Sequence, residues 1–199
     1  MPITIEIPPP PSAPRKVWTR EECEALERAG LINLEHLELI EGDLIRKMPK
    51  KRPHSIGLRA LAIWLGEIFG PAFVETEVAI DVAPEDNPTS QPEPDIIVIK
   101  SKYSTFTKAN PGPQDLQLVV EVAHSTLDFD RSTKANLYAR AGIPEYWVLD
   151  VAGRRMLVHR DPRNGKYASV TAYSDRESVA PLALPQSEFA VRDALPEAD

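Results

Sequence analysis

The chain has 199 residues, 42% of them hydrophobic, and a formal net charge of -7 at pH 7. This is enough apolar material for one substantial core, so we expect a single globular domain over residues 16–199. The acidic balance excludes a protein that coats nucleic acid through bulk charge, because such binding draws on many phosphate contacts. Any contact with nucleic acid must therefore be local.

The N-terminus and the cysteine content bear on the compartment. Residues 1–15 contain the run Pro8–Pro11 and predict a flexible, proline-rich arm. No apolar stretch approaches the length of a membrane span, and the start of the chain lacks the pattern of a signal peptide. The single Cys23 cannot form an intramolecular disulfide. We expect a cytoplasmic protein that makes no membrane contact.

The first predicted elements are a helix and a hairpin. Thr19 and Glu22 form a capping-box pattern that predicts a helix over residues 20–29. Residues 36–48 then give two short strand-like runs around Glu41-Gly42, which is typical of a hairpin turn.

The middle of the chain predicts a long helix followed by strands. Residues 54–69 have a broad apolar face and end at a Gly-Pro pair, which predicts the main packing helix. Residues 74–82 alternate between apolar and polar and predict a half-buried strand. Residues 95–100 and 116–122 are apolar runs that predict two further strands.

The last strand of this series places its residues on two faces. Leu116, Leu118, Val120 and Val122 share one face, so Glu121 is expected to point away from the main core surface. If the two strands are neighbours, Asp95 and Glu121 can lie near one another.

A helix and more strands complete the chain. Residues 131–141 repeat at helical spacing and predict a helix. Residues 145–151 and 154–160 predict a strand and its hairpin partner, and the tail predicts further short strands.

Asp95, Glu121 and Lys134 have the chemistry of a metal-dependent nuclease site. Phosphodiester hydrolysis needs an activated water and a partner for negative charge, which Mg²⁺ or Mn²⁺ bound to carboxylates can supply. A lysine can orient or deprotonate the water and stabilise the phosphate charge. Each residue also has an ordinary interpretation: Asp95 as a turn cap, Glu121 as a solvent-facing side chain, and Asp130 with Lys134 as a helical ion pair.

A basic segment precedes the long helix and is the candidate for phosphate contact. It comprises Arg46, Lys47, Lys50, Lys51 and Arg52, with His54 at the helix start. A solvated loop is the alternative interpretation of the cations. For His54, a ligand or phosphate contact and simple helix capping both remain open.

Several strings together resemble the Uma2 family, formerly a domain of unknown function, within the PD-(D/E)xK restriction-endonuclease-like nucleases. They are LELIEGDL, PEPDIIVI, LVVEVAHSTLDFDRSTK and LYARAGIPEYWVLD. The resemblance implies an α/β fold with a central mixed sheet flanked by helices, an N-terminal helix and hairpin, and short C-terminal strands.

The resemblance also implies roles for individual residues. Asp95 and Glu121 would bind the metal, Glu38 would be a further acid near it, and Lys134 would be the catalytic lysine. Asp130 would orient Lys134. The lysine departs from the superfamily pattern, because Ala123 stands two residues after Glu121.

The sequence thus predicts a Mg²⁺- or Mn²⁺-dependent endonuclease that acts on DNA. One alternative is a non-catalytic, nuclease-like module that binds nucleic acid or a protein partner. Another is a hydrolase built on His124 and Ser125, although adjacent residues rarely have the geometry of a triad. A homodimer is also possible, with the Tyr146-Trp147 segment or the proline arm contributing to its interface.

Overall fold

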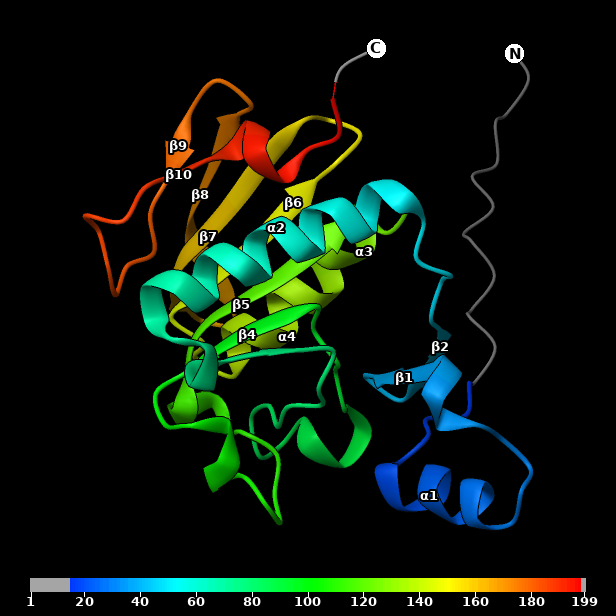
Figure 1. The fold of residues 1–199 in the computed structure, drawn as a ribbon. Helices are drawn as coiled ribbons and strands as arrows, with labels where there is room; N and C mark the ends of the chain where they lie inside the picture. The colour runs from blue at the N-terminus through cyan, green and yellow to red at the C-terminus, as the bar shows by residue number, and fades with distance from the viewer. Residues whose placement is uncertain (1–14, 198–199) are drawn as a thin grey trace, which may run out of the picture.

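A six-stranded mixed sheet forms the centre of the molecule in the computed structural model, which describes residues 15–197 (Figure 1). Its strands follow the order β3-β4-β5-β6-β7-β8. Their bounds are β3 Val74–Thr76, β4 Ile96–Ile99, β5 Leu116–Ala123, β6 Glu145–Asp150, β7 Arg155–Arg163 and β8 Lys166–Ser174. Neighbouring strands are antiparallel except for β5 and β6, which are parallel.

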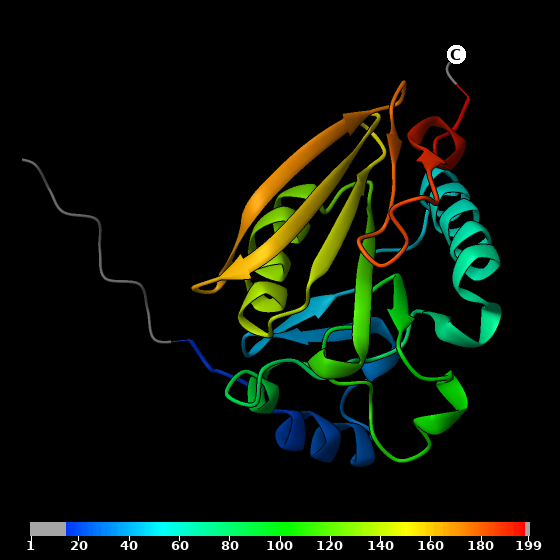
Figure 2. The same ribbon diagram turned by 90° about the vertical axis from the view of Figure 1, so that its left-hand side faces the viewer.

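Helices cover both faces of this sheet, which gives the expected α/β architecture (Figures 1 and 2). Helix α2 (Arg52–Phe69) lies across one face, and α3 (Leu127–Phe129) and α4 (Ala135–Arg140) lie on the other. Strands β4 and β6 are buried throughout because each face of the sheet carries a hydrophobic core. Their continuous apolar sequences reflect this burial on both sides.

The crossover from β5 to β6 carries the helical segment that matters for the site. It runs through α3, a π-helical turn at Asp130–Lys134, and α4. The segment begins four residues before the predicted start at residue 131 and stops at Arg140, one residue before the predicted end at residue 141. A parallel pair of strands requires such a crossover, and the helix is thereby held against the sheet beside β5.

The expected orientation of Glu121 was wrong in one respect. The sheet has a hydrophobic core on each face, and Glu121 lies on the face that α4 covers, with its residue only 5% exposed. Leu116 packs in the core of that same face, because the register between β4 and β5 shifts at Ile99.

The N-terminal part contains helix α1 (Arg20–Arg28) and the hairpin of β1 (Leu37–Ile40) and β2 (Asp43–Arg46). Both halves of the predicted capping box form between Thr19 and Glu22. Glu41 and Gly42 have φ values of 50° and 80°, as a tight hairpin turn requires.

The strand predicted over residues 74–82 is wrong beyond Thr76. Glu77 adopts a φ of 58°, which turns the chain out of the sheet. Ile80 then donates its backbone hydrogen bond to Pro92, whose ring nitrogen cannot return one, so no ladder forms. The alternating apolar residues of this segment are nevertheless buried, as Ile80 and Val82 show.

The C-terminal region is only partly made of short strands. β8 is a nine-residue strand, whereas β9 (Ser178–Val179) and β10 (Phe189–Ala190) form a small antiparallel pair of two residues each. The proline arm predicted for residues 1–15 lies, apart from residue 15, outside the described residues.

Two surface expectations can be compared with the structure. In residues 15–197 no helix is long and apolar enough to cross a membrane. The proposed interface segment is wrong, because Tyr146 and Trp147 are fully buried in β6 and contribute no surface to a partner.

Candidate active site

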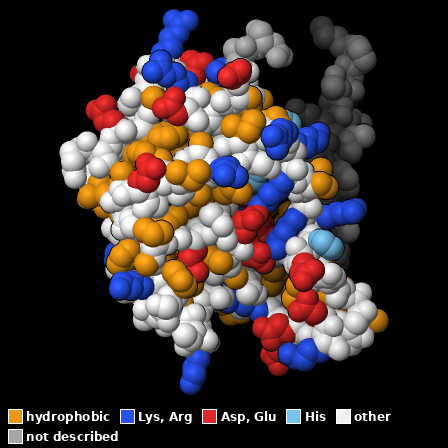
Figure 3. Space-filling view, in the orientation of Figure 1, with side chains coloured by type: hydrophobic (Ala, Val, Ile, Leu, Met, Phe, Trp, Pro, Cys, Tyr) orange, Lys and Arg blue, Asp and Glu red, His pale blue; other side chains and the backbone are white. Residues whose placement is uncertain are grey.

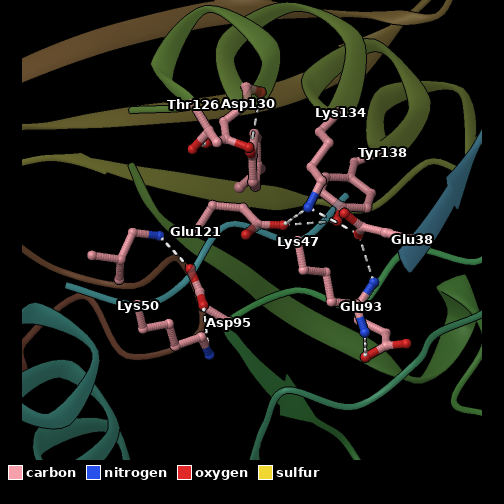
Figure 4. Close-up of polar contacts among 12 residues, drawn as sticks. Glu38, Lys47, Lys50, Glu93, Asp95, Glu121, Thr126, Asp130, Lys134 and Tyr138 are labelled. Carbon is pink, nitrogen blue, oxygen red and sulfur yellow. Dashed lines mark hydrogen bonds and ion pairs between the residues drawn. The ribbon is translucent and has the colours of Figure 1, made fainter. Parts of the chain in front are cut away.

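Asp95 and Glu121 come from adjacent strands and lie on the same side of the sheet. Asp95 immediately precedes β4, and the register Ile96↔Val120 brings it alongside Glu121 on β5. Its Oδ2 accepts a hydrogen bond of 2.8 Å from the backbone N–H of Val122. Figure 4 shows the two carboxylates next to one another. The sheet pairing thus brings together the two acids predicted from the sequence.

Lys134 lies between two carboxylates. Its Nζ is 2.9 Å from Oε1 of Glu121 and 2.9 Å from Oε1 of Glu38 (Figure 4). Tyr138, one helical turn later, donates its hydroxyl to the same oxygen of Glu121 at 3.1 Å. Three segments of chain, namely β1, β5 and the crossover helix, therefore meet at one buried ammonium group.

Burial and neighbouring charges strongly shift the pKa values of Glu121 and Lys134. Burial raises the pKa of Glu121 well above its usual value, and Lys134 opposes that rise only in part. Burial alone would lower the pKa of Lys134, but the charges of Glu121, Glu38 and Asp130 outweigh it and raise the pKa. Lys134 therefore stays protonated at neutral pH.

The pKa of Asp95 is lowered, in contrast to that of Glu121. Burial disfavours its charged form, yet the hydrogen bond from His54 and the nearby charges lower its pKa. Nε2 of His54 is 3.1 Å from Oδ2 of Asp95, and Nζ of Lys50 is 3.5 Å from Oδ1. Asp95 is thus held ionised beside a carboxyl group that resists ionisation, a difference typical of functional sites.

His54 belongs to this site rather than to a helix cap. It is the third residue of α2, whose N-cap position is Lys51 and has no side-chain cap. Its Nδ1 is buried and has no hydrogen-bond partner among residues 15–197. The contact with Asp95 therefore fixes the ring from one side only.

Glu38 is anchored by the backbone of a neighbouring segment. Its Oε1 accepts a hydrogen bond of 2.8 Å from the backbone N–H of Glu93 in addition to the contact with Lys134. The side chain of Glu93 in turn pairs with Lys47 at 2.6 Å. Glu38 thus faces the lysine from the side opposite Glu121 (Figure 4).

The basic segment divides into two groups. Lys47 and Lys50 are engaged with acids at the site, Lys47 with Glu93 and Lys50 with both Asp95 and Glu77. Within the described part of the chain, the exposed residues Arg46, Lys51 and Arg52 form no ion pair. Figure 3 shows blue and red side chains gathered together on this face of the molecule.

Other predicted residues lie near the site without joining it. Asp130 accepts a hydrogen bond of 2.6 Å from Thr126, and no direct bond joins it to Lys134 in residues 15–197. Burial raises its pKa to about 6. His124 is half-buried and Ser125 is exposed, and no hydrogen bond joins their side chains in the described structure.

The donor atoms fit a divalent cation of the hard type. Both Asp95 and Glu121 offer carboxylate oxygens, the ligands that Mg²⁺ and Mn²⁺ prefer. Oε2 of Glu121 accepts no hydrogen bond from residues 15–197, so it is available to a ligand. Within those residues, however, no group of three or more His, Cys, Asp or Glu side chains is arranged to hold a metal ion. Glu38 pairs with Lys134 instead, so a bound ion would need further ligands from water or substrate.

Two participants were not predicted from the sequence. Tyr138 contacts Glu121, and Glu93 joins the hairpin to the site. Tyr138 could have been found from its position four residues after Lys134, whereas nothing in the sequence near Glu93 indicated its contact with Glu38.

The central mixed sheet with helices on both faces is a nuclease-like α/β fold. A family model described as "Uma2: Putative restriction endonuclease" matches residues 20–192, and the chain therefore belongs to the Uma2 family.

The fold has a solved neighbour, described as a "putative nuclease belonging to DUF820" from Anabaena variabilis ATCC 29413. The two structures align with a TM-score of 0.62 at 15% sequence identity, over 84% of this chain and 94% of that one. No curated protein sequence matches the chain.

Proposed function

We propose that this protein is a Mg²⁺- or Mn²⁺-dependent endonuclease that hydrolyses phosphodiester bonds in DNA. The observation that supports it best is the pair of carboxylates from neighbouring strands, Asp95 and Glu121, with the ammonium of Lys134 held 2.9 Å from Glu121. Family membership supports the class of reaction. The identity of the metal, the choice of DNA as substrate and the roles of individual residues go beyond family membership and are proposed here.

Asp95 and Glu121 would hold the metal ion, with Glu38 as a further acid nearby. A bound divalent cation would supply Lewis-acid activation of water and charge compensation for the phosphate. Asp95 is preorganised for this role because the Val122 amide and His54 fix its carboxylate. Tyr138 and Lys134 fix Glu121 in the same way.

Lys134 would act as a hydrogen-bond donor to the negative charge that develops on the phosphate. Its raised pKa keeps the ammonium protonated, which suits electrostatic stabilisation better than removal of a proton from water. Glu38 holds the amine from the opposite side and so positions it. Arg46, Lys51 and Arg52 would contact the phosphates of the substrate outside the site.

The test uses supercoiled plasmid with Mg²⁺, with Mn²⁺ and with chelator. We expect nicking only with metal, and its loss in Asp95→Asn and Glu121→Gln, which preserve side-chain shape. Glu67→Gln changes an exposed glutamate on α2 and serves as the matched control. Thermal unfolding of each variant shows whether it is folded. Full activity in both site variants would rule out the assignment.

The alternative of a non-catalytic, nuclease-like module is favoured by one observation, the absence from residues 15–197 of a preformed cluster of three or more metal-binding side chains. The two functions differ in their response to metal. A nuclease of the proposed kind should be stabilised by millimolar Mg²⁺ or Mn²⁺ in wild type but not in Asp95→Asn. A binding module should show no metal-dependent shift and no cleavage of any nucleic acid.

A further inference from the structure

A cavity lies on the far side of the crossover helix from the candidate active site. It has a volume of about 330 Å³ and lies between the helical segment that follows α3 and strands β7 and β8. Figure 2 shows these helices beside the last strands of the sheet. Its polar lining comes from Arg131, Asn136, Arg155, His159, Lys166 and Tyr167.

The charge of this cavity is opposite to that of the chain. Arg131, Arg155 and Lys166 line it from three different elements, and no acidic residue lines it, although the chain carries a net charge of -7. Lys166 forms no ion pair within residues 15–197. Arg155 and Lys166 stand at opposite ends of the β7–β8 pairing, so the cations are spread along the cavity.

The two arginines have acidic neighbours outside the lining. Arg131 pairs with Asp128 at 2.7 Å, and that aspartate side chain is 88% exposed, so the pair is weak. Nε of Arg155 is 2.9 Å from Asp150, whereas the terminal nitrogens of this guanidinium form no hydrogen bond within the described chain. Both arginines thus retain donors for a further anion.

The wall of the cavity also contains a buried polar group without a partner. His159 is 4% exposed, and its Nδ1 has no hydrogen-bond partner in residues 15–197. Its ring packs against those of Tyr146 and Tyr167, with centroids 5.3 Å and 5.7 Å away. Burial lowers the pKa of His159, which favours the neutral form of its ring. The apolar side of the lining, which includes Leu157 and Val170, suits a flat, uncharged ring.

The cavity shares no lining residue with the candidate active site. Arg131 and Asn136 face the cavity from the same helical segment whose Lys134 contacts Glu121 and Glu38. The segment therefore separates two sites, and a ligand in the cavity would lie behind the lysine rather than on the metal-binding acids.

We infer that this cavity binds a small ligand that carries a phosphate group and is of nucleotide size. Its volume lies in the range of about 300–1,000 Å³ typical of small-molecule sites. Guanidinium groups bind phosphate in a bidentate manner, and an ammonium group adds a point charge. The inference is independent of the proposed cleavage reaction, because it concerns other residues.

The experiment measures binding of three probes by calorimetry: a nucleoside 5′-monophosphate, inorganic phosphate and the nucleoside without phosphate. We expect the monophosphate to bind, the nucleoside not to bind, and affinity to fall as salt rises. The double variant Arg131→Ala/Lys166→Glu should weaken binding at least about tenfold. Lys108→Glu, at an exposed lysine far from the cavity lining, is the matched control and should bind like wild type.

Each result bears on the inference. Equal binding by phosphate and monophosphate, lost in the double variant, supports an anion site that reads only the phosphate group. No binding of either, or an equal loss in Lys108→Glu, overturns it. Preference for a short oligonucleotide, unaffected by the double variant, also overturns it. Glu121→Gln should bind the monophosphate normally, which separates this site from the proposed active site.

Discussion

Lys134 and Glu121 form a buried ion pair in which Nζ and Oε1 are 2.9 Å apart and each side chain is only 6% exposed. Desolvating such a pair is costly, and removing one partner leaves the other charge buried without compensation. Here further contacts offset that desolvation cost, because Glu38 also pairs with Lys134 and Tyr138 also donates a hydrogen bond to Glu121. Strong electrostatic interactions are therefore present at the place where a metal and a phosphate are proposed to bind.

Replacing Lys134 should lower both the stability of the protein and the rate of cleavage. In Lys134→Met, Glu121 and Glu38 would face one another without a cation, so their protonated forms are favoured. We expect the variant to lose about 3–5 kcal/mol of stability at pH 8 and less at pH 5. Cleavage should fall by about a hundredfold or more, while the metal affinity changes less. Urea unfolding at both pH values checks the first part, and a larger loss at pH 5 would contradict it.

Asp130 should make the fold less stable as the pH rises. Its pKa is raised from 3.8 to about 6, chiefly by burial, so the folded state holds a proton that the unfolded state has lost between these values. Its contribution to stability is unfavourable above pH 6 and absent below pH 4. Asp130→Asn should therefore stabilise the protein at pH 8 by about 1–3 kcal/mol and have little effect at pH 4.

The control for this effect is Asp128→Asn, which changes an exposed aspartate in the same helical region. It should leave the pH dependence of unfolding unchanged. Equal stabilisation by both variants would show that general charge, and not the burial of Asp130, sets the effect.

His54 should determine the acid limb of the activity profile through Asp95. Burial opposes ionisation of Asp95, and the hydrogen bond from His54 is the largest factor that lowers its pKa. His54→Ala should raise that pKa, so activity that needs ionised Asp95 would be lost at a higher pH than in wild type. His54→Gln can still donate a hydrogen bond and should lie closer to wild type. Identical pH profiles of kcat/KM for the two variants would argue against this role.

The basic segment should separate into residues that bind the substrate and residues that shape the site. Lys51→Ala and Arg52→Ala should each weaken binding of DNA and reduce its salt dependence by about one phosphate contact. Lys47→Ala removes the partner of Glu93, so it should change the cleavage rate more than the salt dependence. Fluorescence anisotropy over a range of salt concentrations measures both, with Lys102→Ala as an exposed control.

The sequence by itself determined the elements whose signals are local. The Thr19 and Glu22 capping box, the turn at Glu41-Gly42 and the apolar strand β4 follow from short-range hydrogen bonding, backbone preference and burial. It also indicated that Asp95 and Glu121 would lie near one another if their strands were neighbours, because alternation along a strand fixes which side chains share a face. The structure supplies that pairing.

Only the tertiary structure decided what surrounds these acids. The sequence could not show that Glu121 is buried by α4, that Glu38 reaches Lys134 across the fold, or that Lys50 contacts Asp95. Those contacts join segments distant in sequence, and their formation depends on the packing of the whole sheet against its helices. The pKa of each group follows from that packing, since burial and neighbouring charges exist only once the chain has folded.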